Sequence, residues 1–175
     1  MDQTLVIRNA QKSDITALSE LAIQTYSDAF GYTFSDADLT AHVQQHLSPR
    51  RFSRILDEDV VLVAEVGDRL IGYVQFGAAN TASTSSKDQE VRRLYVHSAF
   101  QHAGVGTSLM DAALRHPRLH GAASISLDVW EHNHGAQRFY RRYGFEVIGT
   151  RTFTMESGAA TSLELVMVRR SAPEE

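Results

Sequence analysis

Two glycines mark the stretch of this chain whose residue types point most directly to chemistry. Gly104 and Gly106 lie in QHAGVG, which follows the apolar run RRLYVHSAF and precedes the amphipathic run TSLMDAALR. A glycine-bearing loop between a strand and a helix exposes main-chain N–H groups at the positive end of the helix dipole, where phosphates bind. The loop therefore predicts a phosphate site, with a plain strand-to-helix turn as the alternative.

Two nucleotide-binding loops fit this stretch less well. A P-loop needs a lysine after its last glycine, but Gly106 is followed by Thr107 and Ser108. A dinucleotide loop needs a third glycine where this chain has Leu109. Asp128 follows at the distance of a ribose-binding acid, but the chain lacks the repeated strand–helix–strand units of that fold. We therefore set a nicotinamide or flavin enzyme aside.

The elements that position the loop follow from hydrophobic periodicity and capping residues. We expect helices from Ser13 to about Ala29, from Ser35 to about Leu47, and over 49–57, 104–115 and 134–143. Strands are expected over 4–8, 60–66, 69–77, 90–97 and 123–130, and in the closing runs FEVIGTRTF and SLELVMVR, with a loop over 80–88. This order predicts an α/β fold, a single-layer mixed, mostly antiparallel twisted sheet of about seven strands flanked by about four to five helices, with one parallel strand pair.

Composition narrows the class of protein. The 175 residues predict a single domain over 1–170 and a flexible tail over 171–175. A net charge of -4 without a basic stripe argues against nucleic-acid binding, and no signal or membrane-spanning segment is apparent, so we expect a soluble cytoplasmic protein. The absence of cysteine excludes a thiolate nucleophile and a Cys-ligated zinc site. The pairs His42/His46 and His132/His134 lack further ligands, so no metal is expected.

The segments around the loop combine into a longer pattern. A strand ending Leu-Tyr-Val precedes Q-x-x-G-x-G, and a strand ending in Trp130 precedes N-x-x-A and F-Y-x-x-x-G-F. The pattern resembles the GNAT acyltransferase superfamily, strongly over about 60–150. Its residues here are Gln101, Gly104, Gly106, Asn133, Ala136, Phe139, Tyr140, Gly144 and Phe145. EVRRLYV, DVWEHNHGAQRFYRRYGFEVIGTRTF and SLELVMVR further resemble the bacterial spermine/spermidine acetyltransferase branch, although TMESGAAT is less acidic than that branch implies.

The resemblance implies acetyl-CoA as co-substrate and a splayed, bulged parallel strand pair. The loop would hold the pyrophosphate by main-chain N–H groups, and the strand ending in Val96 would pair with the pantetheine arm. The Val96 N–H would also face the thioester oxygen. The implied cofactor-binding residues are Leu94, Val96, Gln101, His102, Ala103, Gly104, Val105, Gly106, Thr107, Asn133, Ala136 and Arg142. Leu94 and Val96 are equally consistent with core packing, and Asn133 with capping a helix.

Two side chains are candidates for proton transfer. Tyr140 would protonate the departing thiolate, with a core tyrosine as the alternative. Glu90, expected on the same strand face as Arg92, Leu94 and Val96, would take the proton of the amine through a water. The alternative for Glu90 is a surface or salt-bridged carboxylate.

The resemblance implies an acceptor site where the first two helices meet the loops at the open end of the sheet. Tyr26, Tyr32, Phe34 and Glu156 are the candidate substrate-binding residues, with Asp28 and Asp36 nearby. Aromatic and acidic side chains together suit a cationic amine, so the expected reaction is direct acetylation of a small primary amine or polyamine. Acetylation of protein N-termini or lysines and a non-catalytic acyl-CoA sensor are the alternatives. An open sheet edge would allow a homodimer.

Overall fold

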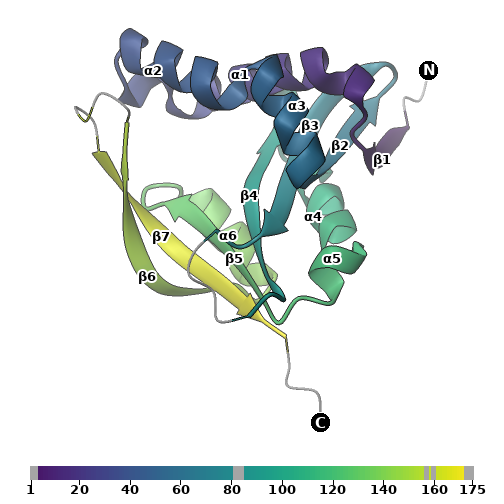
Figure 1. Ribbon diagram of the computed structural model, residues 1–175, viewed down its shortest axis with the longest axis vertical. Helices are drawn as coiled ribbons and strands as arrows, with labels where there is room; N and C mark the ends of the chain where they lie inside the picture. The colour runs from purple at the N-terminus through teal and green to yellow at the C-terminus, as the bar shows by residue number, and fades with distance from the viewer. Residues whose placement is uncertain (1–3, 81–84, 156–157, 159–160, 172–175) are drawn as a thin grey trace.

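The computed structural model describes residues 4–80, 85–155, 158 and 161–171 (Figure 1). Its helices are α1 (Ile15–Phe30), α2 (Asp36–His42), α3 (Pro49–Glu58), α4 (Val105–Arg115), α5 (Pro117–His120) and α6 (His134–Arg142). Its strands are β1 (Leu5–Asn9), β2 (Val60–Val66), β3 (Arg69–Ala78), β4 (Asp88–Val96), β5 (Ser124–Trp130), β6 (Glu146–Thr154) and β7 (Thr161–Arg170). The expected elements are all present. The additional helix is α5, one turn that starts at Pro117, where the sequence predicted only an end to α4.

One mixed sheet runs through the molecule in the order β1-β2-β3-β4-β5-β7-β6. Neighbouring strands are antiparallel except for β4 and β5, which are parallel, so the predicted fold class is confirmed. Figure 1 shows α1, α2 and α3 together at one end, α4 and α5 beside the β1–β4 part, and β6 and β7 extending on the other side.

The core lies on both sides of β3, whose eight interior residues are all buried. Tyr73 packs with Phe52 and other residues of α1 and α3, whereas Val74 packs with Leu109 and other residues of α4. Successive side chains of a strand point to opposite faces. The strand is therefore covered by helices on both faces, which makes it a rigid support for β4.

The parallel pair β4–β5 is short, because the two strands diverge. They pair only through Asp88–Ser124, Gln89–Ile125 and Glu90–Ser126. The rest of β4, to Val96, has no partner on the side that faces β5 among the described residues. The strands thus splay, and a gap opens between them.

A bulge in β4 changes which side chains share a face. Phe76 of β3 pairs with Val91 and Gln75 with Arg93, so Arg92 is an extra residue. Leu94 and Val96 consequently pack with Val91 against the α4-side core. The sequence expectation that Glu90 and Arg92 share a face with Leu94 and Val96 is wrong, because the extra residue shifts the alternation by one.

The capping residues predicted from the sequence lie at the ends of α2 and α6, but not at the start of α1. Ser35 accepts a hydrogen bond from the Asp38 N–H at 3.1 Å, as predicted, and α2 continues as a π-turn to Leu47. Gly144 has φ +82° after α6, which fits its predicted place at the helix end. Ser13 is not a cap, because α1 is preceded by a 3₁₀ turn in which the Gln11 N–H donates to Asp14 Oδ2 at 2.7 Å.

The strand β6 forms the outer edge of the sheet and is largely exposed, including Val147 and Ile148. The homodimer expected on an open edge stays a prediction. Ser171, the first residue of the expected tail, donates hydrogen bonds to the carbonyls of Ala122 and Ala123. The other tail residues, 172–175, lie outside the described residues. Within the described residues no helix is long and apolar enough to span a bilayer.

Candidate functional site

The glycine loop opens directly onto the first turn of α4. Gly104 caps this helix with φ +81°, a left-handed conformation that favours glycine. Gly106 has ordinary helical geometry, and a Cβ added there would meet only Val96 Cγ2, at 3.8 Å. Neither its backbone nor its packing requires a glycine at 106. The missing side chain therefore leaves space above the N–H groups of the first helical turn.

A cavity of about 640 Å³, the loop cavity, lies over this turn and α6. It brings together ten of the twelve residues assigned to cofactor binding from the sequence, which are Leu94, Val96, Gln101, His102, Gly104, Gly106, Thr107, Asn133, Ala136 and Arg142. Ala103 does not line the cavity, and the Val105 side chain is buried in the core. The groove can hold an elongated ligand that runs from the loop along the free side of β4.

Asn133 and Gln101 already have partners in this groove. Asn133 Oδ1 accepts the Ala136 N–H at 3.0 Å, so it caps α6. Gln101 Nε2 donates to the Val96 carbonyl at 3.2 Å. A ligand that pairs with β4 at Val96 would compete with this second bond.

A second cavity of about 590 Å³, the central cavity, fills the gap between β4 and β5. Tyr140 lines both this cavity and the loop cavity, and its side chain packs on Phe145 with ring centroids 5.9 Å apart. Burial, and to a lesser extent nearby Tyr95, raises the pKa of the Tyr140 phenol above its ordinary value of about 10. The group therefore remains a neutral hydrogen-bond donor at neutral pH.

Glu90 lines the central cavity but is bound by other residues. Its Oε2 accepts hydrogen bonds from Arg92 Nη1 at 2.6 Å and from the Asn80 N–H at 3.2 Å. Arg92 also bonds Asp59 and the Ala78 carbonyl. The geometry is that of the salt-bridged alternative, because the carboxylate is held by an arginine and a main-chain N–H.

Two other carboxylates, Asp128 and Glu164, line the central cavity. Burial raises the pKa of each, while nearby Arg151, which bonds Asp128 Oδ2 at 2.9 Å, opposes the shift in both. The charge of Glu90 also raises the pKa of Asp128, and the charge of Asp128 raises the pKa of Glu164. The sequence analysis assigned no role to Glu164, although a single carboxylate inside the apolar strand SLELVMVR was a usable signal.

A third cavity of about 850 Å³, the aromatic cavity, continues from the central one toward α1 and β6. Tyr26 and Phe34 line it as expected, together with the aromatic residues Phe30, Tyr95, Trp130 and Phe153, which the sequence analysis did not select. Tyr32 does not, because it is 75% exposed on the surface, and Glu156 lies outside the described residues. Asp28 lines the central cavity, and Asp36 lines none of the three.

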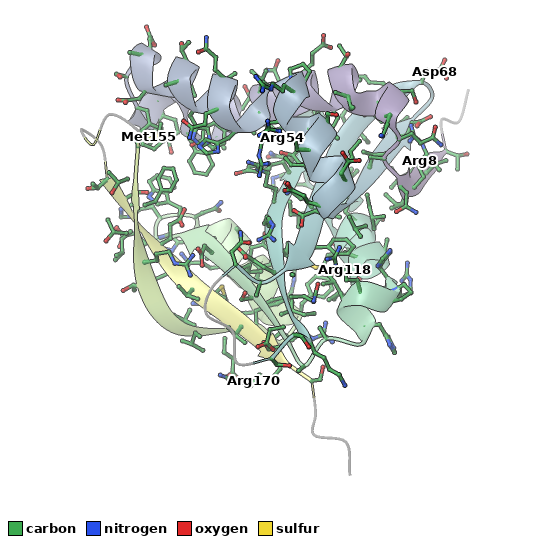
Figure 2. The ribbon with its side chains drawn as sticks, in the orientation of Figure 1. Arg8, Arg54, Asp68, Arg118, Met155 and Arg170 are labelled. Carbon is green, nitrogen blue, oxygen red and sulfur yellow. The ribbon has the colours of Figure 1, made fainter. Side chains whose placement is uncertain are left out.

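The β6–β7 part of the sheet closes the far side of the aromatic cavity. Phe153 of β6 lies edge-on to His42 of α2, with ring centroids 6.2 Å apart, and buried Met155 follows where the strand ends (Figure 2). The ring centroids of His42 and His46 are 4.6 Å apart. The described residues nevertheless contain no group of three or more side chains that could hold a metal ion.

Comparisons with known proteins give a consistent result. The profile of the Acetyltransferase (GNAT) family matches residues 18–145. A Mycobacterium tuberculosis protein named as an uncharacterized N-acetyltransferase is 30% identical over 159 residues, 90% of this chain and 97% of that protein. A Bacillus subtilis spermine/spermidine N(1)-acetyltransferase is 28% identical over 90 residues, 50% of this chain and 59% of that protein. The crystal structure of PaiA N-acetyltransferase from Thermoplasma acidophilum, in complex with coenzyme A, is similar with a TM-score of 0.79 at 19% identity, covering 96% of this chain and 99% of that one.

Proposed function

Because this chain belongs to the GNAT acetyltransferase family, we propose that it transfers an acetyl group from acetyl-CoA directly to a small primary amine. The observation that carries this proposal is the continuity of the three cavities across the splayed strands. Tyr140 lines the loop and central cavities, and Tyr95 and Glu164 line the central and aromatic cavities. Two substrates can enter from opposite ends and meet between β4 and β5, so no acyl-enzyme is needed. As an acyltransferase, the chain is not a non-catalytic sensor.

The loop cavity is the proposed site of the coenzyme. The first N–H groups of α4 would hold the pyrophosphate, and the absence of a Cβ at Gly106 would let the phosphates approach them. The pantetheine arm would lie along the free side of β4 at Leu94 and Val96, which the strand splay leaves without a partner. This placement carries the thioester into the central cavity beside Tyr140.

Tyr140 is the proposed proton donor to the departing sulfur. Burial keeps its phenol neutral, so the O–H is available as negative charge develops on the thiolate. Burial would raise the pKa of the coenzyme thiol in the same direction as that of the phenol. The difference between the two pKa values, which governs the proton transfer, is therefore not made less favourable than in water. No positive charge is needed at the sulfur.

We propose that the proton of the amine passes to the carboxylates that line the central cavity, which are Glu90, Asp128 and Glu164. An alkylammonium must lose a proton before it can attack, because it has no lone pair. Among the described residues the Glu164 side chain makes no hydrogen bond or ion pair, whereas the side chains of Glu90 and Asp128 each bond an arginine. Glu164 is therefore the best placed of the three to accept a proton, through a water, and Glu90 supports it.

The Glu164→Gln variant is expected to lower kcat/KM about 10-fold at neutral pH, because the amide keeps the shape of the side chain but cannot accept a proton. The raised pKa of Glu164 also predicts that the wild-type rate falls as pH drops through that value, since the group must be ionised to act. The variant should lose this acidic limb. Measurement of kcat/KM against pH for the two proteins checks both expectations.

Two further variants provide a control and test the competing proton acceptor. Glu146→Gln changes an exposed glutamate of β6 that lines none of the three cavities, so it should leave the profile unchanged. If Glu90→Gln reduces kcat/KM more than Glu164→Gln does, the proton acceptor is Glu90, as the sequence suggested.

The proposed acceptor class rests on the aromatic cavity, whose rings and carboxylates suit a small cation. Polyamines are one candidate, supported by the partial likeness to the spermine/spermidine enzyme. A panel of primary amines, polyamines and short peptides with acetyl-CoA, followed by thiol release and mass spectrometry of the product, tests the proposal. Acetylation of small amines is expected. Acetylation of peptides alone would assign the chain to the protein N-acetyltransferases.

A further inference from the structure

An arginine without a carboxylate partner lines the aromatic cavity. Arg93 Nη1 donates to Gln75 Oε1 at 2.9 Å and Nη2 to the His46 carbonyl at 3.4 Å, and within the described residues it forms no ion pair. The adjacent Arg92 is different, since it bonds both Asp59 and Glu90. A partly buried guanidinium that faces a cavity and forms no ion pair among the described residues is suited to bind an anion.

The orientation of Arg93 is fixed by buried groups beneath the cavity. Gln75 is 2% exposed, and its Nε2 donates to Asp59 Oδ2 at 2.7 Å while its Oε1 accepts from Arg93. Asp59 occupies the space left by Gly77, where a Cβ would lie 1.9 Å from Asp59 Oδ1. The guanidinium is thus held in place before any ligand arrives, which reduces the entropic cost of binding.

The aromatic cavity is also lined by a negative group, the Glu164 carboxylate. Arg93 and Glu164 act on the pKa of the Tyr95 phenol in opposite directions, although burial is the larger cause and raises that pKa to about 12. Tyr95 is therefore near both charges, and all three residues line the aromatic and central cavities. Arg93 lies on β4 and Glu164 on β7, which pairs with β5 across the gap. A ligand in this space can therefore meet a cation on one side and an anion on the other.

We propose that the acceptor is an amine that also bears a carboxylate, an amino-carboxylate, with Arg93 binding the carboxylate and the amine lying toward Glu164 and Tyr140. This inference rests on the proposed function and narrows its acceptor class. A polyamine is the less favourable acceptor, because an ammonium group would have to lie beside Arg93.

Pairs of acceptors that differ only in the carboxylate test the inference. Acetylation of L-phenylalanine is compared with that of 2-phenylethylamine, and 4-aminobutyrate with propylamine, with spermidine as the polyamine. The wild-type protein should favour the carboxylate member of each pair by about 10-fold or more in kcat/KM, the effect of one charge-assisted, bidentate contact. Equal rates within the pairs, or a preference for spermidine, would overturn the inference and leave the proposed function standing. Failure to acetylate any amine would overturn both.

Variants of Arg93 assign the preference to this side chain. Arg93→Gln should abolish the preference for the carboxylate, measured as the ratio of kcat/KM values within each pair, and Arg93→Lys should retain part of it. Arg54→Gln removes an exposed arginine of α3 and serves as the charge-matched control. A preference that survives in Arg93→Gln contradicts the assignment. If Arg93→Gln does not fold, a reduced preference in Arg93→Lys supports the assignment and an unchanged preference contradicts it.

Discussion

The Tyr140→Phe variant is expected to lose about 10²-fold in kcat for amine acetylation while it binds acetyl-CoA as tightly as the wild-type protein. Phenylalanine keeps the ring, and with it the packing on Phe139 and Phe145, at centroid distances of 5.4 and 5.9 Å. Only the O–H is lost, so the thiolate must leave without a proton from the protein. Steady-state kinetics, with the coenzyme Kd from calorimetry, separates the two quantities.

Tyr143→Phe is the matched control for this prediction. Tyr143 follows the same helix, but its hydroxyl donates to Asp111 Oδ1 of α4 at 2.9 Å and lines neither the loop nor the central cavity. Its loss should leave kcat within about twofold of wild type, since it removes a hydrogen bond away from the sulfur. Equal kcat in Tyr140→Phe and wild type would show that another group, or water, protonates the thiolate.

Local signals explain why the elements around the loop could be predicted. Three kinds of signal depend only on residues close in sequence: the apolar run of β2, the proline at the start of α3, and the left-handed glycines at 104 and 144. The order of these elements then restricts the sheet to few topologies. The fold and the place of the loop cavity could therefore be predicted from the chain alone.

Features that depend on pairing between distant strands could not be predicted in this way. The extra residue at Arg92 in β4 is defined only against β3, and it moves Leu94 to the other face from the one expected. Glu164 reaches the central cavity because β7 pairs with β5, with Glu164 opposite Trp130. Strand register is set by tertiary packing, and a shift by one residue reverses every side chain that follows.

The surroundings of Glu90 and Tyr32 could not be predicted, for a related reason. The chemical type of each residue suits its expected role, but its neighbours are set by the fold. Arg92 lies two residues after Glu90 and binds its carboxylate, and Tyr32 lies in a 3₁₀ turn that directs the ring to solvent. Burial and charge pairing decide what a side chain can do, and both arise only in the folded chain.

The Gly106→Ala variant is expected to bind acetyl-CoA about 10-fold or more weakly while its folding is unimpaired or slightly improved. Residue 106 lies in the first turn of α4 with ordinary helical geometry, where alanine is more favourable than glycine by about 1 kcal/mol at most. The added methyl group would meet only Val96 Cγ2, at 3.8 Å, so the protein tolerates it. It would project over the N–H groups that are proposed to hold the pyrophosphate. Thermal unfolding and calorimetry with the coenzyme measure the two effects.

Gly104→Ala distinguishes a loss of stability from a loss of binding space. Its Cβ would meet nothing within 4 Å, but φ +81° is unfavourable for alanine, so this variant should lose about 1 kcal/mol of folding free energy. The two glycines are thus expected to be needed for different reasons, Gly104 for the conformation of the turn and Gly106 for the approach of a ligand. If Gly106→Ala binds acetyl-CoA with the wild-type Kd, the phosphates do not approach the first turn of α4, and the coenzyme must bind elsewhere.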